Sequence, residues 1–312
     1  MIKKISYNGR DEWLSLRKGY IGGSDAGAVI GLNPYKSAYT LWAEKTGKIP
    51  EFEGNITTRV GAYLEELVAR MFTEETGKSV RRLNKMLVND EYPFACADVD
   101  RVVVGEGAIL EIKTTNSIPV VKKFKSGEYP ESWYAQMTHY LAVSGMKKAY
   151  LAVLIECREF RVFELERDEA EIATLMEAER CFWELVQNGI PPVADGSDSS
   201  TKTIAQIYPE SSESAGVADL NGYGSVLDEY MALGAQIKSL EELKDRAANK
   251  VKLFLGECGR GESDRHKVNW TSTERSSFDS KRFANEHPEI DLSDYYKTSI
   301  VRAFKVTEKK EK

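Results

Sequence analysis

Apolar residues recur with two different periods along the first two-thirds of the chain. In some segments they return every three or four residues, as on one face of a helix, and two of these segments end at a glycine. In others they alternate or run together, as in strands. Helices are expected over 57–78, 131–145 and 168–189, a hairpin over 96–115, and strands over 149–155 and 159–166. This order predicts an α/β (α+β) fold in which helices flank a mixed sheet.

The last third has a different pattern. Residues 195–216 are rich in Ser, Gly and acidic residues, which favours an exposed connector. A long amphipathic helix, or a helical hairpin arm, is expected over 225–257, and two strands at 266–273 and 299–306 around a short helix near 279–286. The predicted domains are a core at 1–195, a connector at 196–216, and a helical and β region at 217–312 for oligomerisation, DNA or partner contact.

Composition narrows the class of protein. The longest apolar runs, such as 149–155, are too short to cross a bilayer, and the N-terminal residues contain no apolar signal core, so we expect a cytoplasmic protein. The 4 cysteines are dispersed, which favours free thiols, and with 3 histidines a histidine-rich metal site is not expected.

The formal net charge of −6 excludes nucleic-acid binding through bulk positive charge, so any such function needs local basic patches. Residues 120–127 form one candidate, with Lys122, Lys123 and Lys125. A solvated loop explains the same residues equally well.

Four charges interrupt the apolar pattern of the 96–115 hairpin. Glu111 and Lys113 lie two apart on one strand, so both point to the same face. A two- or four-residue turn would place Asp100 on that face as well, whereas a three-residue turn would send it to the other. The sequence alone leaves the turn length open, although Glu106-Gly107 is a plausible two-residue turn.

Two carboxylates on a rigid hairpin are suited to holding Mg²⁺, and a lysine beside them can orient or deprotonate a metal-bound water. The spacing of Asp100, Glu111 and Lys113 is therefore typical of phosphodiester cleavage. A surface salt-bridge ladder would have the same spacing.

Two helices carry further candidates. On the helical wheel of 57–78, Glu65 lies at the edge of the buried stripe, where it can reach inward as a metal ligand, whereas Glu66 points to solvent. Gln136 on 131–145 can bond to the lysine, to a water or to substrate, and His139 is expected at the surface. Ordinary boundary positions explain Glu65 and Gln136 as well.

The segment 22–32 predicts a loop that enters a short helix with Ser24 or Asp25 as N-cap. Backbone N–H groups and the Ser24 hydroxyl, with Arg17 supplying charge, are suited to binding a phosphate. The charge of Asp25 opposes this, and a simple capped helix fits the same residues.

Four segments in order resemble the YqaJ-type viral recombinase family, phage alkaline exonucleases related to lambda exonuclease within the PD-(D/E)xK nuclease superfamily. They are WLSLRKGYIGGS, VGAYLEELVAR, VDR…LEIK and WYAQMTHYL, between Trp13 and Ala149. The resemblance implies a restriction-endonuclease-like PD-(D/E)xK core, to which the C-terminal helical and β region is an extension.

The resemblance also implies residue roles. Two Mg²⁺ ions, for which Mn²⁺ is a conceivable substitute, would be held by Glu65, Asp100, Glu111 and the backbone carbonyl of Ile112. Lys113 would act on the attacking water with support from Gln136. Arg17 and Ser24 would bind the terminal 5′-phosphate of the digested strand.

The chain departs from the family pattern at the hairpin, where Val99 replaces the superfamily proline before Asp100. Asp98 is a competing acid two residues away, and Asp90 matches a further acidic position less securely. Residues beyond about 195 have no counterpart in a minimal lambda-type exonuclease.

The predicted function is therefore a Mg²⁺-dependent 5′-to-3′ exonuclease that degrades one strand of linear double-stranded DNA with 5′-phosphate ends, for phage recombination by single-strand annealing. The resemblance implies a RecT/Beta-type annealing partner, a ring-shaped trimer, and a phage or prophage protein in the bacterial cytoplasm. The alternatives are a structure- or sequence-selective endonuclease of the same fold, and a non-catalytic module that binds DNA ends.

Overall fold

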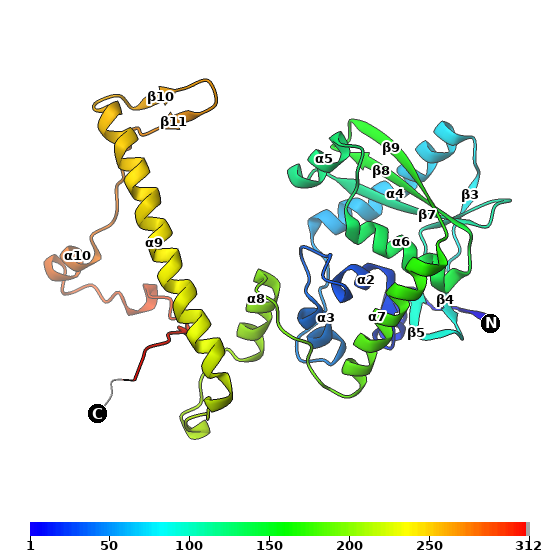
Figure 1. Ribbon diagram of the computed structural model, residues 1–312, viewed down its shortest axis with the longest axis horizontal. Helices are drawn as coiled ribbons and strands as arrows, with labels where there is room; N and C mark the ends of the chain where they lie inside the picture. The colour runs from blue at the N-terminus through cyan, green and yellow to red at the C-terminus, as the bar shows by residue number, and fades with distance from the viewer. Residues whose placement is uncertain (310–312) are drawn as a thin grey trace. The chain divides into compact units, whose positions relative to one another are not determined.

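The structure is a computed structural model that describes residues 1–309. The chain divides into two compact units, Met1–Tyr208 and Pro209–Lys312. Unit 1 contains the two larger sheets and most helices, and unit 2 contains one long helix, one short helix and a small two-stranded hairpin (Figure 1).

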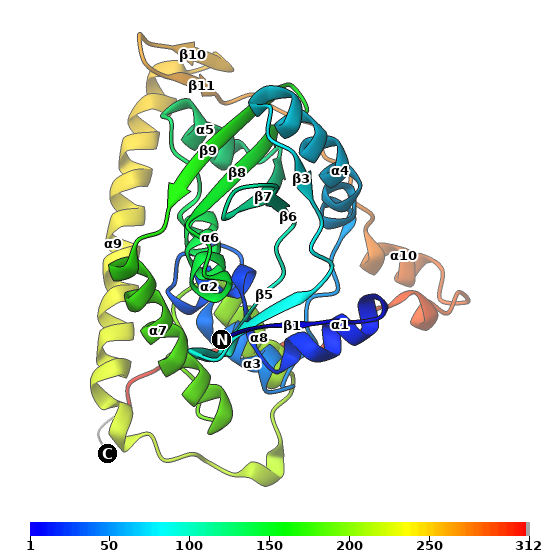
Figure 2. The same cartoon turned by 90° about the vertical axis from the view of Figure 1, so that its right-hand side faces the viewer.

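Unit 1 is built on two sheets whose strands Figures 1 and 2 show side by side. The larger sheet has the order β3-β6-β7-β8-β9, in which β7 and β8 are parallel and the other pairs antiparallel. The smaller has the order β1-β4-β5-β2. The strands are β1 Ile2–Ile5, β2 Ile21–Gly22, β3 Val80–Arg81, β4 Met86–Asn89, β5 Tyr92–Ala97, β6 Arg101–Val103, β7 Ala108–Thr115, β8 Lys148–Ile155 and β9 Glu159–Glu166.

Helices cover both faces of the larger sheet, as the strand pattern predicts. The helices of unit 1 are α1 Gly9–Lys18, α2 Gly23–Val29, α3 Ala38–Lys45, α4 Ile56–Thr76, α5 Ile118–Lys125, α6 Glu131–Ser144, α7 Glu169–Gln187 and α8 Asp198–Ile207. Val68 and Phe72 of α4 pack on one face with Leu110 and Ile112 of β7, whereas Met137 and Leu141 of α6 share the core of the other face. The central strands are therefore buried on both sides, which explains their near-continuous apolar runs.

The predicted helix ends are confirmed where glycine sets them. Gly77 after α4 has φ +70° and Gly189, two residues after the end of α7, has φ +66°, both left-handed positions that favour glycine. The predicted N-cap of α2 is wrong. Gly22 is the cap, and the Asp25 carboxylate accepts its N–H at 3.1 Å from the third position of the helix.

The serine-rich segment is also not a plain exposed connector. Its residues 198–207 form α8, and side-chain hydroxyls join this helix to the start of α3. Thr40 Oγ1 bonds to Ser199 Oγ and to Thr203 Oγ1 at 2.8 Å each, and Ser200 is fully buried. Small hydroxyl side chains allow this close packing, so the composition that suggested a linker instead supports a helix contact.

Unit 2 follows the expected helices but not all of the expected strands. Its elements are the 3₁₀ turns Glu213–Ala215, Asn221–Tyr223 and Ser293–Tyr295, the helices α9 Gly224–Leu255 and α10 Ser280–Glu286, and the strands β10 Arg260–Glu262 and β11 Lys267–Asn269. The strand predicted at 299–306 is wrong, because this segment is irregular and Phe304 lies against Tyr230 of α9, with ring centroids 5.3 Å apart. The helix at 225–257 is continuous, so the hairpin alternative is not formed.

Among residues 1–309, no helix is both long and apolar enough to cross a membrane.

Candidate active site

The β6–β7 hairpin resolves the turn length that the sequence left open. Arg101 pairs with Leu110 and Val102 with Ile109, so four residues, 104–107, form the turn. This register places Asp100 opposite Glu111 on the same face. The Ile112 N–H donates to Asp100 Oδ2 at 2.8 Å, which fixes the Asp100 carboxylate against the neighbouring strand.

Glu111, Lys113 and Gln136 form a connected polar network. Lys113 Nζ lies 2.7 Å from Glu111 Oε1 and donates to Gln136 Oε1 at 2.8 Å. The Gln136 amide in turn donates to Glu111 Oε1 at 2.8 Å and to the Tyr140 hydroxyl at 3.1 Å. One glutamine therefore orients both the acid and the lysine, and the three predicted residues do converge.

The carboxylates of Asp100 and Glu111 carry negative charge that is not fully compensated and that a bound cation would neutralise. Glu111 is buried, and its Oε2 has no hydrogen-bond partner. Burial, and then the nearby charge of Glu111, raise the pKa of Asp100 well above its ordinary value. Buried oxygens without donors are costly unless a cation binds them, so these two acids fit a hard divalent metal such as Mg²⁺.

Glu65, the third predicted metal ligand, does not join Asp100 and Glu111 and instead pairs with arginines. Its carboxylate pairs with the guanidinium of Arg101, which is buried on the α4 side of the sheet, and lies 3.6 Å from Arg82. Within residues 1–309, no three His, Cys, Asp or Glu side chains lie close enough together to hold a metal ion. The structure thus brings together Asp100 and Glu111. Arg101 is the residue after Asp100, so its side chain points to the opposite face of the strand, where it pairs with Glu65.

Arg17 and Ser24 also converge, at the start of α2. Arg17 Nη2 donates to Ser24 Oγ, and the guanidinium stacks over Trp13 with 5.3 Å between its carbon and the ring centroid. Asp25 is neutralised by the buried Lys45, 3.2 Å away, as well as by Arg17 at 3.5 Å. Lys45 was missed at the level of sequence, and it removes the objection that Asp25 would repel an anion.

Lys45 and Arg17 have the largest effect on the pKa of Asp25 after burial. Burial works to raise the pKa of Asp25, but Lys45 and then Arg17 outweigh it and hold the pKa far below the ordinary range. Asp25 therefore remains charged, and Arg17, Asp25 and Lys45 together carry one net positive charge beside the Ser24 hydroxyl.

The two competing acids have other partners. Asp98 accepts a hydrogen bond from the Trp13 indole, and burial raises its pKa. Asp90 lies in the turn between β4 and β5, where it pairs with Lys3 at 2.5 Å and with the Met1 amino group at 3.6 Å. Neither acid is in the Glu111–Lys113–Gln136 network.

His139 is the clearest error at the level of sequence, because it is buried and not at the surface. Its Nδ1 lies 2.8 Å from Glu179 Oε1 of α7, and its Nε2 lies 2.8 Å from the Cys96 carbonyl of β5. Helix α6 lies between a strand and another helix, so its wheel has no solvent face around this residue. The signal in the sequence was Glu179, an acid at a position of the 168–189 helix where its apolar stripe would continue, which indicates a buried polar partner.

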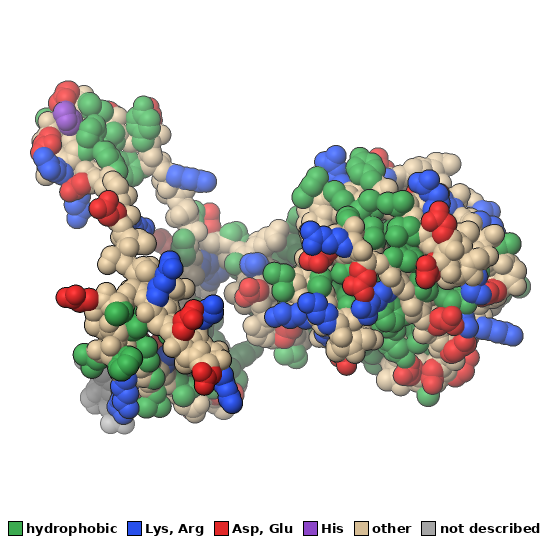
Figure 3. All heavy atoms as spheres, turned by 90° about the horizontal axis from the view of Figure 1, so that it is seen from above, with side chains coloured by type: hydrophobic (Ala, Val, Ile, Leu, Met, Phe, Trp, Pro, Cys, Tyr) green, Lys and Arg blue, Asp and Glu red, His purple; other side chains and the backbone are tan. Residues whose placement is uncertain are grey.

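The basic segment at 120–127 forms helix α5 and not a loop, with Lys122, Lys123 and Lys125 in its last turn. Over the face of unit 1 visible in Figure 3, basic and acidic side chains are interspersed among apolar ones. This pattern agrees with the chain's acidic total and leaves local clusters as the source of any positive field.

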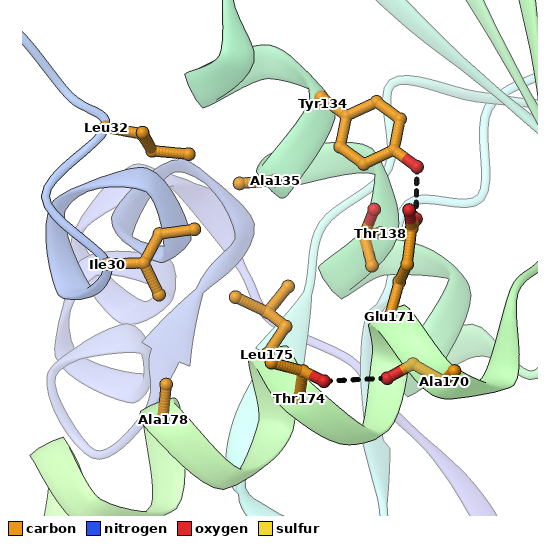
Figure 4. A pocket seen from close by; sticks show the side chains of 10 residues that line it. All are labelled: Ile30, Leu32, Tyr134, Ala135, Thr138, Ala170, Glu171, Thr174, Leu175 and Ala178. Carbon is orange, nitrogen blue, oxygen red and sulfur yellow. Dashed lines mark hydrogen bonds between the residues drawn. The ribbon is translucent and has the colours of Figure 1, made fainter.

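One apolar pocket of about 500 Å³ lies apart from these groups, between the loop after α2 and helices α6 and α7. Figure 4 shows Ile30, Leu32 and Leu175 on its walls and Tyr134 bonded to Glu171 at its rim. It contains none of Asp100, Glu111 and Lys113, so it is separate from the polar network on the hairpin.

Comparison with known proteins gives the family of this chain. The YqaJ-like viral recombinase domain is matched by residues 12–147. The chain is 34% identical over 294 residues to the protein "Uncharacterized protein YqaJ" of Bacillus subtilis (strain 168), covering 93% of this chain and 92% of that one. The chain therefore belongs to the YqaJ-like viral recombinase family.

The fold is similar to that of an alkaline exonuclease, LHK-Exo from Laribacter hongkongensis, with a TM-score of 0.51 and 21% identity. The similarity covers 58% of this chain and 94% of that one. A structure of LHK-Exo in complex with dAMP matches equally well. These similarities show that this chain has a fold similar to that of an alkaline exonuclease.

Proposed function

We propose that this protein is a Mg²⁺-dependent 5′-to-3′ exonuclease that degrades one strand of linear double-stranded DNA. The observation that carries the proposal is the network in which Gln136 holds Lys113 and Glu111 together while Glu111 Oε2 has no donor, beside Asp100. A buried acid pair with one lysine is what metal-assisted phosphodiester hydrolysis requires.

Asp100 and Glu111 would hold Mg²⁺, with the backbone carbonyl of Ile112, and Glu65 would join them after leaving Arg101. When bound, two Mg²⁺ ions would acidify the attacking water and offset charge on both the attacking and the leaving oxygen.

The remaining roles belong to this chain's own side chains. Lys113 has its Nζ 2.7 Å from Glu111 Oε1, where it can orient or activate the attacking water or offset charge on the phosphate. Gln136 fixes the lysine and the acid at one distance from each other, which limits their motion before the reaction. Tyr140 accepts the second Gln136 N–H and completes this support.

The end of the strand would be recognised at the start of α2. Arg17, whose Nη2 already points toward Ser24 and Asp25, would bind a 5′-phosphate together with the Ser24 hydroxyl. The digested strand would expose its partner for an annealing protein of the RecT/Beta type, and a ring-shaped trimer would keep the enzyme on the DNA.

The test is digestion of linear duplex DNA bearing 5′-phosphate or 5′-hydroxyl ends, in Mg²⁺ or in EDTA, by the full chain and by its Lys113→Ala variant. Covalently closed circular DNA is the matched substrate without ends. We expect loss of linear DNA only, faster from 5′-phosphate, dependent on Mg²⁺ and abolished in the variant.

Other results would redirect the proposal. Nicked or linearised circles would identify an endonuclease on the same fold. DNA binding with no cleavage in either Mg²⁺ or Mn²⁺ would mean that the hairpin is not catalytic and that the protein holds DNA ends.

A further inference from the structure

A second pocket, which is polar and rich in arginine, lies on the α4 side of the larger sheet. It has a volume of about 400 Å³, and helix α4, strand β3 and strand β6 form its walls. Arg70, Arg81, Arg82 and Arg101 line it, together with two acids, Glu66 and Glu74. We call these four arginines the arginine pocket. In a chain with a net charge of −6, four guanidinium groups around one cavity are a strong local concentration of positive charge.

The ion pairs in this pocket leave part of that charge uncompensated. Glu66 forms salt bridges with Arg101 at 3.0 Å and with Arg82 at 3.3 Å, and Glu65 forms salt bridges with the same two arginines. Across residues 1–309, Arg70 and Arg81 have no carboxylate within salt-bridge distance. Both are exposed, so their guanidinium groups are available to an anion that enters the cavity.

The pocket is joined to the catalytic hairpin by Arg101, the residue after Asp100. Arg101 Nη1 donates to the Asp100 carbonyl at 2.7 Å, and the same guanidinium holds Glu65 and Glu66. Its side chain is only 4% exposed, so it is a fixed part of the wall. An anion in the pocket would therefore lie next to the strand that carries the predicted metal ligands.

We propose that the arginine pocket binds a backbone phosphate of the DNA substrate, with Glu66 as a counter-ion that the phosphate displaces from Arg82. Guanidinium groups bind phosphate through paired N–H donors, and a phosphodiester supplies the negative charge that Arg70 and Arg81 lack. Glu66 is 60% exposed, so it can move into water once its arginine is occupied. This site is distinct from the Arg17–Ser24 pair, and it rests on the proposed function because it takes that function's substrate.

The test measures DNA binding without cleavage, by fluorescence anisotropy of the full chain with a labelled blunt duplex in EDTA over a range of salt concentrations. The double variant Arg70→Gln/Arg81→Gln removes the two unpaired arginines. We expect about tenfold weaker binding at low salt and a salt slope smaller by about 0.9, the value for one lost phosphate contact.

Two further variants distinguish phosphate binding in the arginine pocket from an effect of the protein's overall charge on DNA binding. Arg180→Gln removes an arginine that Glu177 and Glu184 of α7 already hold, and it should bind DNA like the wild type. Glu66→Gln frees Arg82 and Arg101 from one acid, so it should bind DNA more tightly. An effect of overall charge would also appear in Arg180→Gln, so changes confined to the pocket variants identify the pocket as the phosphate site.

The outcomes distinguish the two proposals. Suppose the double variant binds DNA with the affinity and salt slope of Arg180→Gln while the wild type still digests DNA in Mg²⁺. The proposal that the arginine pocket binds a phosphate is then wrong, and the proposed function stands. If the wild type neither binds nor digests DNA, the proposed function fails and the pocket fails with it.

Discussion

Gln136 donates a hydrogen bond from its amide to Glu111 Oε1 at 2.8 Å and thereby ties helix α6 to strand β7 at the predicted catalytic hairpin. The same side chain accepts from Lys113, so one residue controls the separation of an acid and a base that lie two positions apart. A side chain that orients ligands in this way is worth testing separately from the ligands themselves.

Replacing Gln136 with Leu should lower the rate of Mg²⁺-dependent digestion by about 10- to 100-fold, because partners of metal ligands have effects of this size. Binding of DNA in EDTA should be unchanged, since Gln136 is buried. Tyr140→Phe removes only the hydroxyl that accepts from Gln136 and should have a smaller effect on the same rate. Equal losses in both variants would contradict the orienting role of Gln136.

Replacing Lys113 with Ala should lower the digestion rate by about 10²- to 10⁴-fold, the range expected for a group that assists proton transfer. Lys148→Ala is a matched control on the next strand, because its ammonium pairs with Glu164 and Glu166 and not with the hairpin acids. Single-turnover digestion separates this effect from DNA binding. A Lys113→Ala protein that digests at the wild-type rate would remove the lysine from the mechanism.

Gly23 of α2 has no room for a side chain. A Cβ atom there would lie 2.3 Å from the Tyr140 ring, so Gly23→Ala must displace the tyrosine that supports Gln136. We expect a loss of about 1–3 kcal/mol in the free energy of unfolding, as for other overpacked cores, together with slower digestion. Gly107→Ala, which meets nothing within 4 Å, should change neither chemical denaturation nor activity.

The buried His139–Glu179 pair should make stability depend on pH. Burial works to lower the pKa of His139, but Glu179 and the Cys96 carbonyl outweigh it and raise the pKa above 6.5. Burial raises the pKa of Glu179 above 4.5, against the effect of His139. Both groups bind protons more tightly when folded, so the stabilisation by His139 is complete below pH 6.5 and is lost as the pH rises through its raised pKa.

Urea denaturation between about pH 6 and pH 9, spanning the ordinary and the raised pKa of histidine, tests this pair. The free energy of unfolding should fall with pH more steeply in the wild type than in His139→Phe/Glu179→Leu. His139→Leu alone should cost about 3–5 kcal/mol, since it leaves Glu179 buried and unpaired. Parallel pH curves for the wild type and the double variant would refute the coupling.

The sequence by itself determined the local elements of this protein. Periodicity and glycine placed α4, α6 and α7 and the strands β8 and β9 nearly at their observed bounds, because helix period and left-handed termini are local properties. It also placed Glu111 and Lys113 on one face of the strand, since strand alternation constrains which face a residue occupies.

Only the tertiary structure decided how the hairpin turns and what each charge contacts. The four-residue turn, the capture of Glu65 by Arg101 and the neutralisation of Asp25 by Lys45 join residues far apart in the chain. His139 and α8 were misjudged for the same reason, because a polar residue is buried when a partner from another element satisfies it. Local spacing carries no information about such partners, so packing alone settles them.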